Sequence, residues 1–195
     1  CAKCGIPLMF WREVPVDPHD LGSTAQACMP TILQAFLRRP ADVDAGQAFE
    51  RKLYVCRRTI ERAADANPAL AGKIFYVCSM SSRTIVYKGM LVATQMRRFF
   101  TDLNDAAVET SLALVHSRYS TNTTPSWERA HPNRYIIHNG EINTLRGNIS
   151  WTRAREPKLY SPALGDDLRQ VLPIINREGS DSAILDNVLE FLTMN

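Results

Sequence analysis

The chain has 195 residues, of which 45% are hydrophobic and 22% charged, and its formal net charge is +3. This length and apolar content allow one sizeable core, so we expect a single domain over residues 1–195. The near balance of 23 basic and 20 acidic residues argues against a nucleic-acid partner. No apolar run of about twenty residues predicts a membrane span.

The five cysteines predict free thiols in a reducing compartment, because their number is odd and no secretory signal precedes them. Cys1 and Cys4 form a C-x-x-C pair, but a zinc site would need two further ligands at matching spacing. The other cysteines form no second pair in the sequence, so we expect no metal site. Cys56 and Cys78 fall in helical and strand patterns and are expected to be small core residues.

The first third of the chain contains an extended segment, a strand and a helix. Residues 7–16 predict the extended segment, and residues 30–37 predict the strand. Residues 42–65 predict an amphipathic helix, because apolar side chains recur at steps of three or four: Phe49, Leu53, Cys56 and Ile60. The opposite face is basic, a pattern typical of a solvated surface: Arg51, Lys52, Arg57, Arg58 and Arg62.

Strand patterns dominate the middle of the chain. Residues 74–80 and 84–88 predict a hairpin, and residues 92–103 predict a short helix after it. Residues 112–115 and 134–137 predict two short buried strands, each of which opens directly into a polar loop.

The last third is predicted to be mainly helical. Residues 144–155 predict a helix in which Trp151 is a core or packing aromatic and not a substrate contact. Residues 168–175 predict a helix kinked at Pro173, and residues 183–192 predict a final helix. The interleaving of strands and helices favours a layered α+β fold.

The two polar loops and the start of the final helix carry the candidate chemistry. Asn139-Gly140 alone is typical of a β-hairpin tip, but its backbone N–H and side-chain amide also suit an oxyanion. Arg118 offers a planar fork for a carboxylate. Asp181 is either a cap or first-turn acid of the helix or a partner for an ammonium group. Together these groups describe a pocket for an α-amino acid with a reactive carbonyl.

Three ordered motifs resemble the glutamine-binding motifs of class II glutamine amidotransferases: HSRYSTN, HNGEIN and GSDSAILDN. Further stretches are similar to one branch of that family, the amidotransferase domain at the start of the glutamate synthase large subunit. These are WREVPVD, ERKLYVCRRTIE and FYVCSMSSRTIVYKGM. The resemblance implies an N-terminal-nucleophile (Ntn) hydrolase fold, a four-layer αββα sandwich of which this chain would hold a part.

The resemblance also implies roles for individual residues. Arg118 would clamp the glutamine α-carboxylate and Asp181 its α-ammonium, while Asn139 and Gly140 would form the oxyanion hole. Tyr119 and Thr121 would line the pocket, and His116 and His138 would pack behind the loops. The activity implied is hydrolysis of glutamine, with the ammonia joined to 2-oxoglutarate and reduced to give glutamate.

The nucleophile of the resembled family is a cysteine at the mature N-terminus, which makes Cys1 a candidate. The segment WREVPVD, which follows within ten residues, resembles the middle of the domain, so we expect the chain to begin inside the domain and to lack its nucleophile. Two alternatives stay open. One is a free-standing Ntn glutaminase that uses Cys1, and the other is a non-catalytic amino-acid-binding module.

Cofactors are expected outside this chain. The resemblance implies FMN and an iron–sulfur cluster in later domains, and the sequence contains no cluster-type cysteine run. The implied partners are L-glutamine, the remaining domains of the large subunit, and an electron-donating subunit or ferredoxin. The implied location is the cytoplasm, or the plastid stroma for a plant protein.

Overall fold

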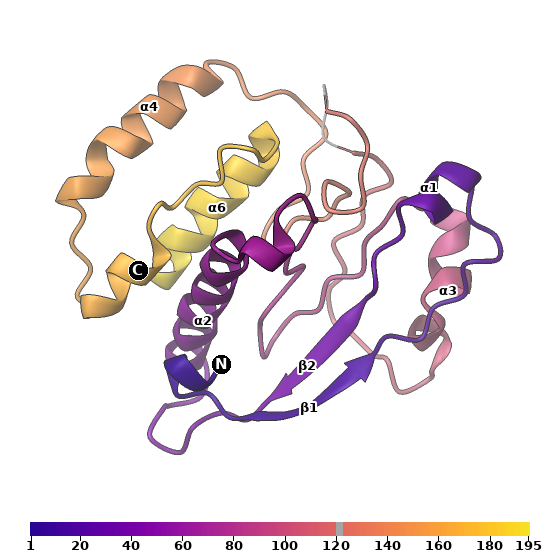
Figure 1. Ribbon diagram of the computed structural model, residues 1–195, viewed down its shortest axis with the longest axis horizontal. Helices are drawn as coiled ribbons and strands as arrows, with labels where there is room; N and C mark the ends of the chain where they lie inside the picture. The colour runs from indigo at the N-terminus through magenta and orange to yellow at the C-terminus, as the bar shows by residue number, and fades with distance from the viewer. Residues whose placement is uncertain (120–122) are drawn as a thin grey trace.

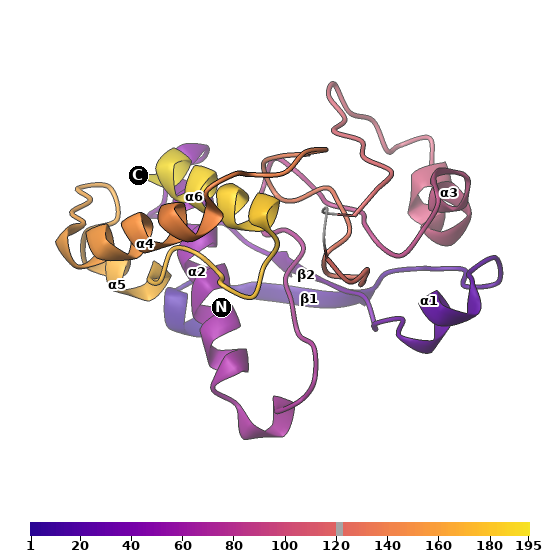
Figure 2. The same cartoon turned by 90° about the horizontal axis from the view of Figure 1, so that it is seen from above.

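The computed structural model describes residues 1–119 and 123–195, and it is α+β with a small antiparallel sheet. In chain order the elements are η1 (Ala2–Cys4), β1 (Leu8–Glu13), α1 (Ser23–Ala27), β2 (Leu33–Leu37), α2 (Gln47–Asp65), η2 (Pro68–Leu70), η3 (Ala93–Gln95), α3 (Met96–Phe99), η4 (Thr101–Asn104), α4 (Leu145–Arg155), η5 (Glu156–Lys158), η6 (Gly165–Asp167), α5 (Leu168–Val171) and α6 (Asp181–Met194). Figures 1 and 2 show α2, α4 and α6 on one side of the molecule and α1 and α3 on the other.

The predicted extended segment and first strand are confirmed as β1 and β2, which pair antiparallel with Trp11 opposite Ala35. Phe10 and Phe36 stack with ring centroids 4.5 Å apart. Both strands leave large apolar side chains exposed, including Trp11 at 59% and Leu33 at 54%. The ribbon therefore carries apolar surface that the described residues leave uncovered.

Helix α2 confirms the predicted amphipathic helix, although it begins at Gln47 rather than near Asp42. Phe49, Leu53 and Cys56 are buried, as their spacing predicts. The prediction of a solvated basic face was wrong at Arg57, which is only 2% exposed and lies between Glu61 and Glu190. A sequence pattern cannot show that α6 covers this face of α2.

Helix α6 confirms the predicted final helix and extends it at both ends. It packs against α2, and its last carbonyls accept hydrogen bonds from side chains at the start of α2. Gln47 donates to the Thr193 carbonyl at 2.6 Å and Arg51 to the Met194 carbonyl at 2.7 Å. These donors satisfy carbonyl groups that have no partner inside a helix.

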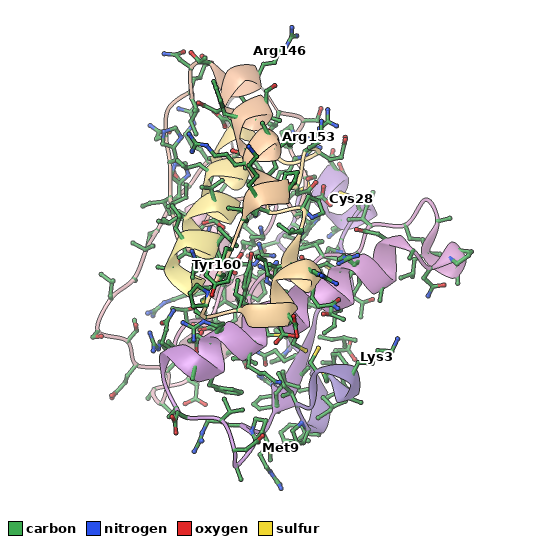
Figure 3. The ribbon with its side chains drawn as sticks, turned by 90° about the vertical axis from the view of Figure 1, so that its left-hand side faces the viewer. Lys3, Met9, Cys28, Arg146, Arg153 and Tyr160 are labelled. Carbon is green, nitrogen blue, oxygen red and sulfur yellow. The ribbon has the colours of Figure 1, made fainter. Side chains whose placement is uncertain are left out.

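Helix α4 also confirms its prediction and runs alongside α6 (Figure 1). In Figure 3 the Arg146 side chain points outward from one end of α4. The prediction that Trp151 packs in the core was wrong, since 68% of this residue is exposed. Residues 168–175 are helical only as far as Val171, because Pro173 cannot continue a helix.

The opposite side of the molecule is built on a second apolar cluster. Phe99 and Phe100 pack edge to face at 4.8 Å, and Phe99 also contacts Trp127. The Trp127 indole N–H donates to the Ala25 carbonyl at 3.1 Å, which ties α1 to this cluster. The helix predicted over residues 92–103 is present as three short turns, η3, α3 and η4.

Four predicted strands were wrong. Within the described residues, no β-ladder forms over 74–80, 84–88, 112–115 or 134–137. Residues 112–115 are not buried either, with Leu112 75% exposed. A strand needs a partner for its backbone groups, and the apolar pattern of one segment does not reveal whether that partner is present.

Candidate functional site

His131, a residue that is 5% exposed, lies between the first and second motifs in the chain and packs against the first. The rings of His116 and His131 lie 4.4 Å apart. Burial lowers the pKa of His131 to about 4, with help from the nearby charges of His116, Lys88 and His138, while Asp181 acts in the opposite direction. His131 is therefore in ring contact with the first motif and within electrostatic range of His138 and Asp181 in the other two.

Asp181 lies at the start of α6 and contacts the loop that contains Asn139 and Gly140. Its Oδ2 accepts a hydrogen bond from the Ile142 backbone N–H at 2.8 Å, and its Oδ1 accepts from the Ser182 N–H at 2.6 Å. The helix cap is a different residue, Ser180, whose Oγ accepts from the Ala183 N–H at 3.2 Å. Asp181 is thus the first-turn acid, where the helix dipole favours a negative charge.

Arg118 and Tyr119 lie on the first motif loop. The Arg118 backbone N–H is 3.1 Å from His116 Nδ1, which fixes the turn, and the Arg118 side chain is exposed. Tyr119 forms an isolated antiparallel bridge with Ala130, next to His131. Burial raises the pKa of the Tyr119 hydroxyl. Thr121, the other predicted lining residue, lies outside the described residues.

Asn139 and Gly140 occupy the exposed turn that follows His138. A Cβ placed on Gly140 would lie 3.4 Å from the His138 ring, so the turn is packed closely against this imidazole. The predicted oxyanion residues are thus adjacent to His138, whose charge acts on the pKa of His131.

Cys1 lies in another part of the structure. It packs with Cys4 against an apolar cluster on α2 that contains Ile6, Leu53 and Cys56. The candidate nucleophile Cys1 therefore lies beside α2. The described residues assigned to glutamine binding lie elsewhere, on the motif loops and at the start of α6.

A cavity of about 400 Å³ lies between α4 and α6 and has Asp181 in its wall. The other lining residues are mostly apolar and include Ile142, Leu145, Trp151, Ile184 and Val188. Mostly apolar walls with a few polar groups are typical of small-molecule sites. Trp151, predicted as a core aromatic, contributes to this cavity.

Sequence reasoning missed His131, a buried residue whose ring packs against that of His116. The signal was weak: a histidine between Ala130 and Pro132, outside all three motifs. Its burial and its contact with His116 depend on segments that meet only in the folded chain.

The described part of the chain contains neither a three-ligand metal site nor a membrane-spanning helix. Within residues 1–119 and 123–195, histidine, cysteine and acidic side chains form no group of three placed to hold a metal ion. Among the helices that the structure describes, none has the length and apolar character needed to cross a lipid bilayer.

Comparison with known proteins agrees with the three motifs. The whole chain, residues 1–195, matches the sequence model of the family described as Glutamine amidotransferases class-II. The chain belongs to this family. The resemblance inferred from the motifs is thereby confirmed.

Similar curated proteins are glutamate synthases. The chain is 51% identical to the glutamate synthase [NADPH] large chain of Bacillus subtilis over 190 residues, which are 97% of this chain and 12% of that protein. It is 47% identical to glutamate synthase [NADH] of Schizosaccharomyces pombe, over 97% of this chain and 9% of that protein. The ferredoxin-dependent, chloroplastic glutamate synthase of Spinacia oleracea is 42% identical over 98% of this chain and 12% of its own length. The chain thus spans about a tenth of these relatives.

Proposed function

We propose that this chain is the glutamine-recognition part of a glutamate synthase amidotransferase domain. The domain hydrolyses the side-chain amide of glutamine, and the ammonia is transferred reductively to 2-oxoglutarate to give glutamate. The observation that carries the proposal is the hydrogen bond from the Ile142 N–H to Asp181, which joins the second and third glutamine-binding motifs in a chain of this family.

The recognition groups have complementary charges. Arg118 binds the α-carboxylate of glutamine with its guanidinium fork, and Asp181 binds the α-ammonium. Asn139 and Gly140 donate hydrogen bonds to the oxyanion that forms when a thiolate attacks the amide carbonyl. Tyr119 and Thr121 line the pocket.

We assign glutamine recognition and oxyanion stabilisation to the described residues, and the nucleophile of the family mechanism is an N-terminal cysteine thiolate. Cys1 packs against the α2 cluster, so we do not assign it this role. His131 stays neutral at pH 7 and acts by packing under the loops, since its pKa of about 4 makes it a poor general base there.

We further propose that residues 1–195 form one domain with the rest of a four-layer αββα sandwich. The exposed apolar side chains of β1 and β2 support this, because a sandwich covers both faces of such a ribbon. We assign FMN and the iron–sulfur cluster of a glutamate synthase to other domains of the full-length protein, and the sequence contains no cysteine run typical of such a cluster. Electron donation, by a partner subunit or ferredoxin, is likewise assigned to those domains.

The test is a steady-state measurement of ammonia release from L-glutamine by the full-length polypeptide of the reading frame that contains this sequence. Asp181→Asn and Arg118→Gln each remove one charge-assisted contact, so KM should rise about 10- to 100-fold. Asp166→Asn and Arg146→Gln make the same changes at exposed positions and should leave KM unchanged. An unchanged KM in both site variants would contradict the assignment.

A labelling experiment separates this proposal from a free-standing Cys1 enzyme. An electrophilic glutamine analogue is incubated with the 195-residue chain, and adducts are located by mass spectrometry. We expect no stoichiometric adduct on Cys1. A single adduct there, prevented by L-glutamine, would make Cys1 the nucleophile and refute the assignment of recognition alone.

A further inference from the structure

A second carboxylate on α6, Asp186, contacts the segment that leads to Asn139 and Gly140. Asp186 is 1% exposed and accepts hydrogen bonds from three consecutive backbone N–H groups. The Arg134 N–H lies 3.2 Å from its Oδ2, and the Tyr135 and Ile136 N–H groups lie 2.7 and 3.0 Å from its Oδ1. These donors have no β-ladder within the described residues, so Asp186 replaces the partner strand.

The same segment is held at its other end by Asp181, through the Ile142 N–H at 2.8 Å. Asp181 and Asp186 lie five positions apart on α6, and the segment 134–142 spans the distance between their contacts. The Arg134 side chain fixes the first residue as well, since it donates to Glu61 at 3.2 Å and to the Val77 carbonyl. His138, Asn139 and Gly140 therefore form the part of the segment between two anchored ends.

We propose that Asp186 is a positioning residue that fixes residues 134–136 and thereby holds Asn139 and Gly140 in place to stabilise the oxyanion. The inference rests on the proposed glutaminase function for its catalytic consequence. Asp186 acts through the backbone, so its effect differs from that of Asp181. The oxyanion donors contact the substrate only in the transition state, so their displacement lowers kcat. Loss of a contact to bound glutamine raises KM instead.

The alternative is that Asp186 only adds stability to the α6 region. The two roles predict different changes in unfolding midpoint, amide exchange and kcat. A stabilising residue alters the unfolding midpoint and the exchange of α6 and α2 together. A positioning residue alters local exchange over 134–142 and kcat, with KM nearly unchanged.

Asp186→Asn is the test variant, because it keeps the side-chain shape while replacing one acceptor oxygen with an NH₂ group that cannot accept from N–H donors. It is made in the full-length polypeptide, with Asp166→Asn as the matched control at an exposed position. Amide hydrogen exchange by mass spectrometry and steady-state ammonia release are measured on the same preparations.

We expect exchange over residues 134–136 to accelerate at least about 10-fold in Asp186→Asn, with α2 unchanged. We also expect kcat to fall at least about 10-fold with KM within about 3-fold, because loss of a whole oxyanion donor costs about 100-fold or more. Unchanged local exchange, unchanged kcat, or a uniform acceleration that includes α2 would each overturn the inference.

The unsubstituted protein provides a test that does not depend on the variant folding. Its amides at 134–136 should exchange slowly although they lie in no regular element. Exchange of these three amides at the rate of unprotected amides overturns the inference. If the unsubstituted protein releases no ammonia, the proposed function fails, while the exchange measurements still decide whether Asp186 holds this segment.

Discussion

The helix pair α2–α6 and the motif loops over residues 112–142 satisfy their polar groups in different ways. In α2 and α6 the backbone bonds to itself, so side chains are available to build a core and a buried ion cluster of Arg57, Glu61 and Glu190. In the loops, several backbone N–H groups donate to side chains instead, such as those of Asp181, Asp186 and His116. A change of one side chain should therefore alter overall stability in the helices and local geometry in the loops.

The largest expected effect is on the helix pair, at Glu190. Glu190→Ala removes a partner of Arg57, which is buried. An incompletely paired buried guanidinium should lower the free energy of unfolding by about 3 to 5 kcal/mol. Urea denaturation followed by circular dichroism measures this, with Glu109→Ala as a control on an exposed glutamate. A midpoint equal to that of the unsubstituted chain would show that α6 does not cover Arg57.

The next largest loss of stability is expected in the apolar cluster that contains Phe99, Phe100 and Trp127. In Gly89→Ala the new Cβ would lie 2.4 Å from the Trp127 ring, which is buried and cannot move freely. We expect a loss of about 3 kcal/mol, because overpacking displaces neighbouring side chains. Thermal unfolding followed by tryptophan fluorescence measures it. Gly22→Ala is the control, since nothing lies within 4 Å of its added Cβ; equal midpoints for both variants would refute this packing.

A smaller effect is predicted from the pH dependence of stability. Burial lowers the pKa of His131 to about 4 from its ordinary value of 6.5, so between these values the unfolded state binds the proton and the folded state does not. Stability should thus fall as the pH drops through this window, by on the order of 2 kcal/mol.

The pH effect is measured by urea denaturation at pH 7 and pH 4.5. His131→Asn should flatten the dependence, whereas His19→Asn, at an exposed side chain, should not. The same slope in the His131 variant as in the unsubstituted chain would mean that His131 is not buried among the loops.

The smallest effect is expected at the Arg98–Asp20 pair, whose side chains are 69% and 40% exposed. Solvent screens such pairs, so Asp20→Asn should leave the unfolding midpoint unchanged. Differential scanning calorimetry in low and high salt checks this. A clear decrease at low salt would assign α3 a larger electrostatic role than its exposure allows.

The sequence predicted the elements whose pattern is local. Helices α2, α4 and α6 were predicted from the spacing of apolar residues, and the start of α6 also from Ser180 and Asp181. These signals are local, because each compares residues within about one turn of the chain. Strand predictions over 112–115 and 134–137 failed because they depend on a partner elsewhere in the chain. The burial of Arg57 could not be foreseen for the same reason, since Glu190 lies 133 positions away.

The candidate site was predictable as a set of motifs but not as an arrangement. The order of the three motifs indicated the family, which the comparison confirmed. His131 and Asp186 were not singled out, because their roles depend on which backbone groups and rings lie next to them after folding. The side-chain roles of Arg118, Asn139, Gly140 and Asp181 stay predictions.

The most direct test of the central claim uses the four histidines of the chain. His116, His131 and His138 lie at the proposed site, and His19 is an exposed reference. Selective NMR of the labelled imidazole rings is recorded while L-glutamine is added to the chain. The account predicts that the three site histidines shift together and saturate while His19 does not, and that Asp181→Asn weakens the response. Constant signals from all four rings, or a shift of His19 alone, would contradict a glutamine site built by the three motifs.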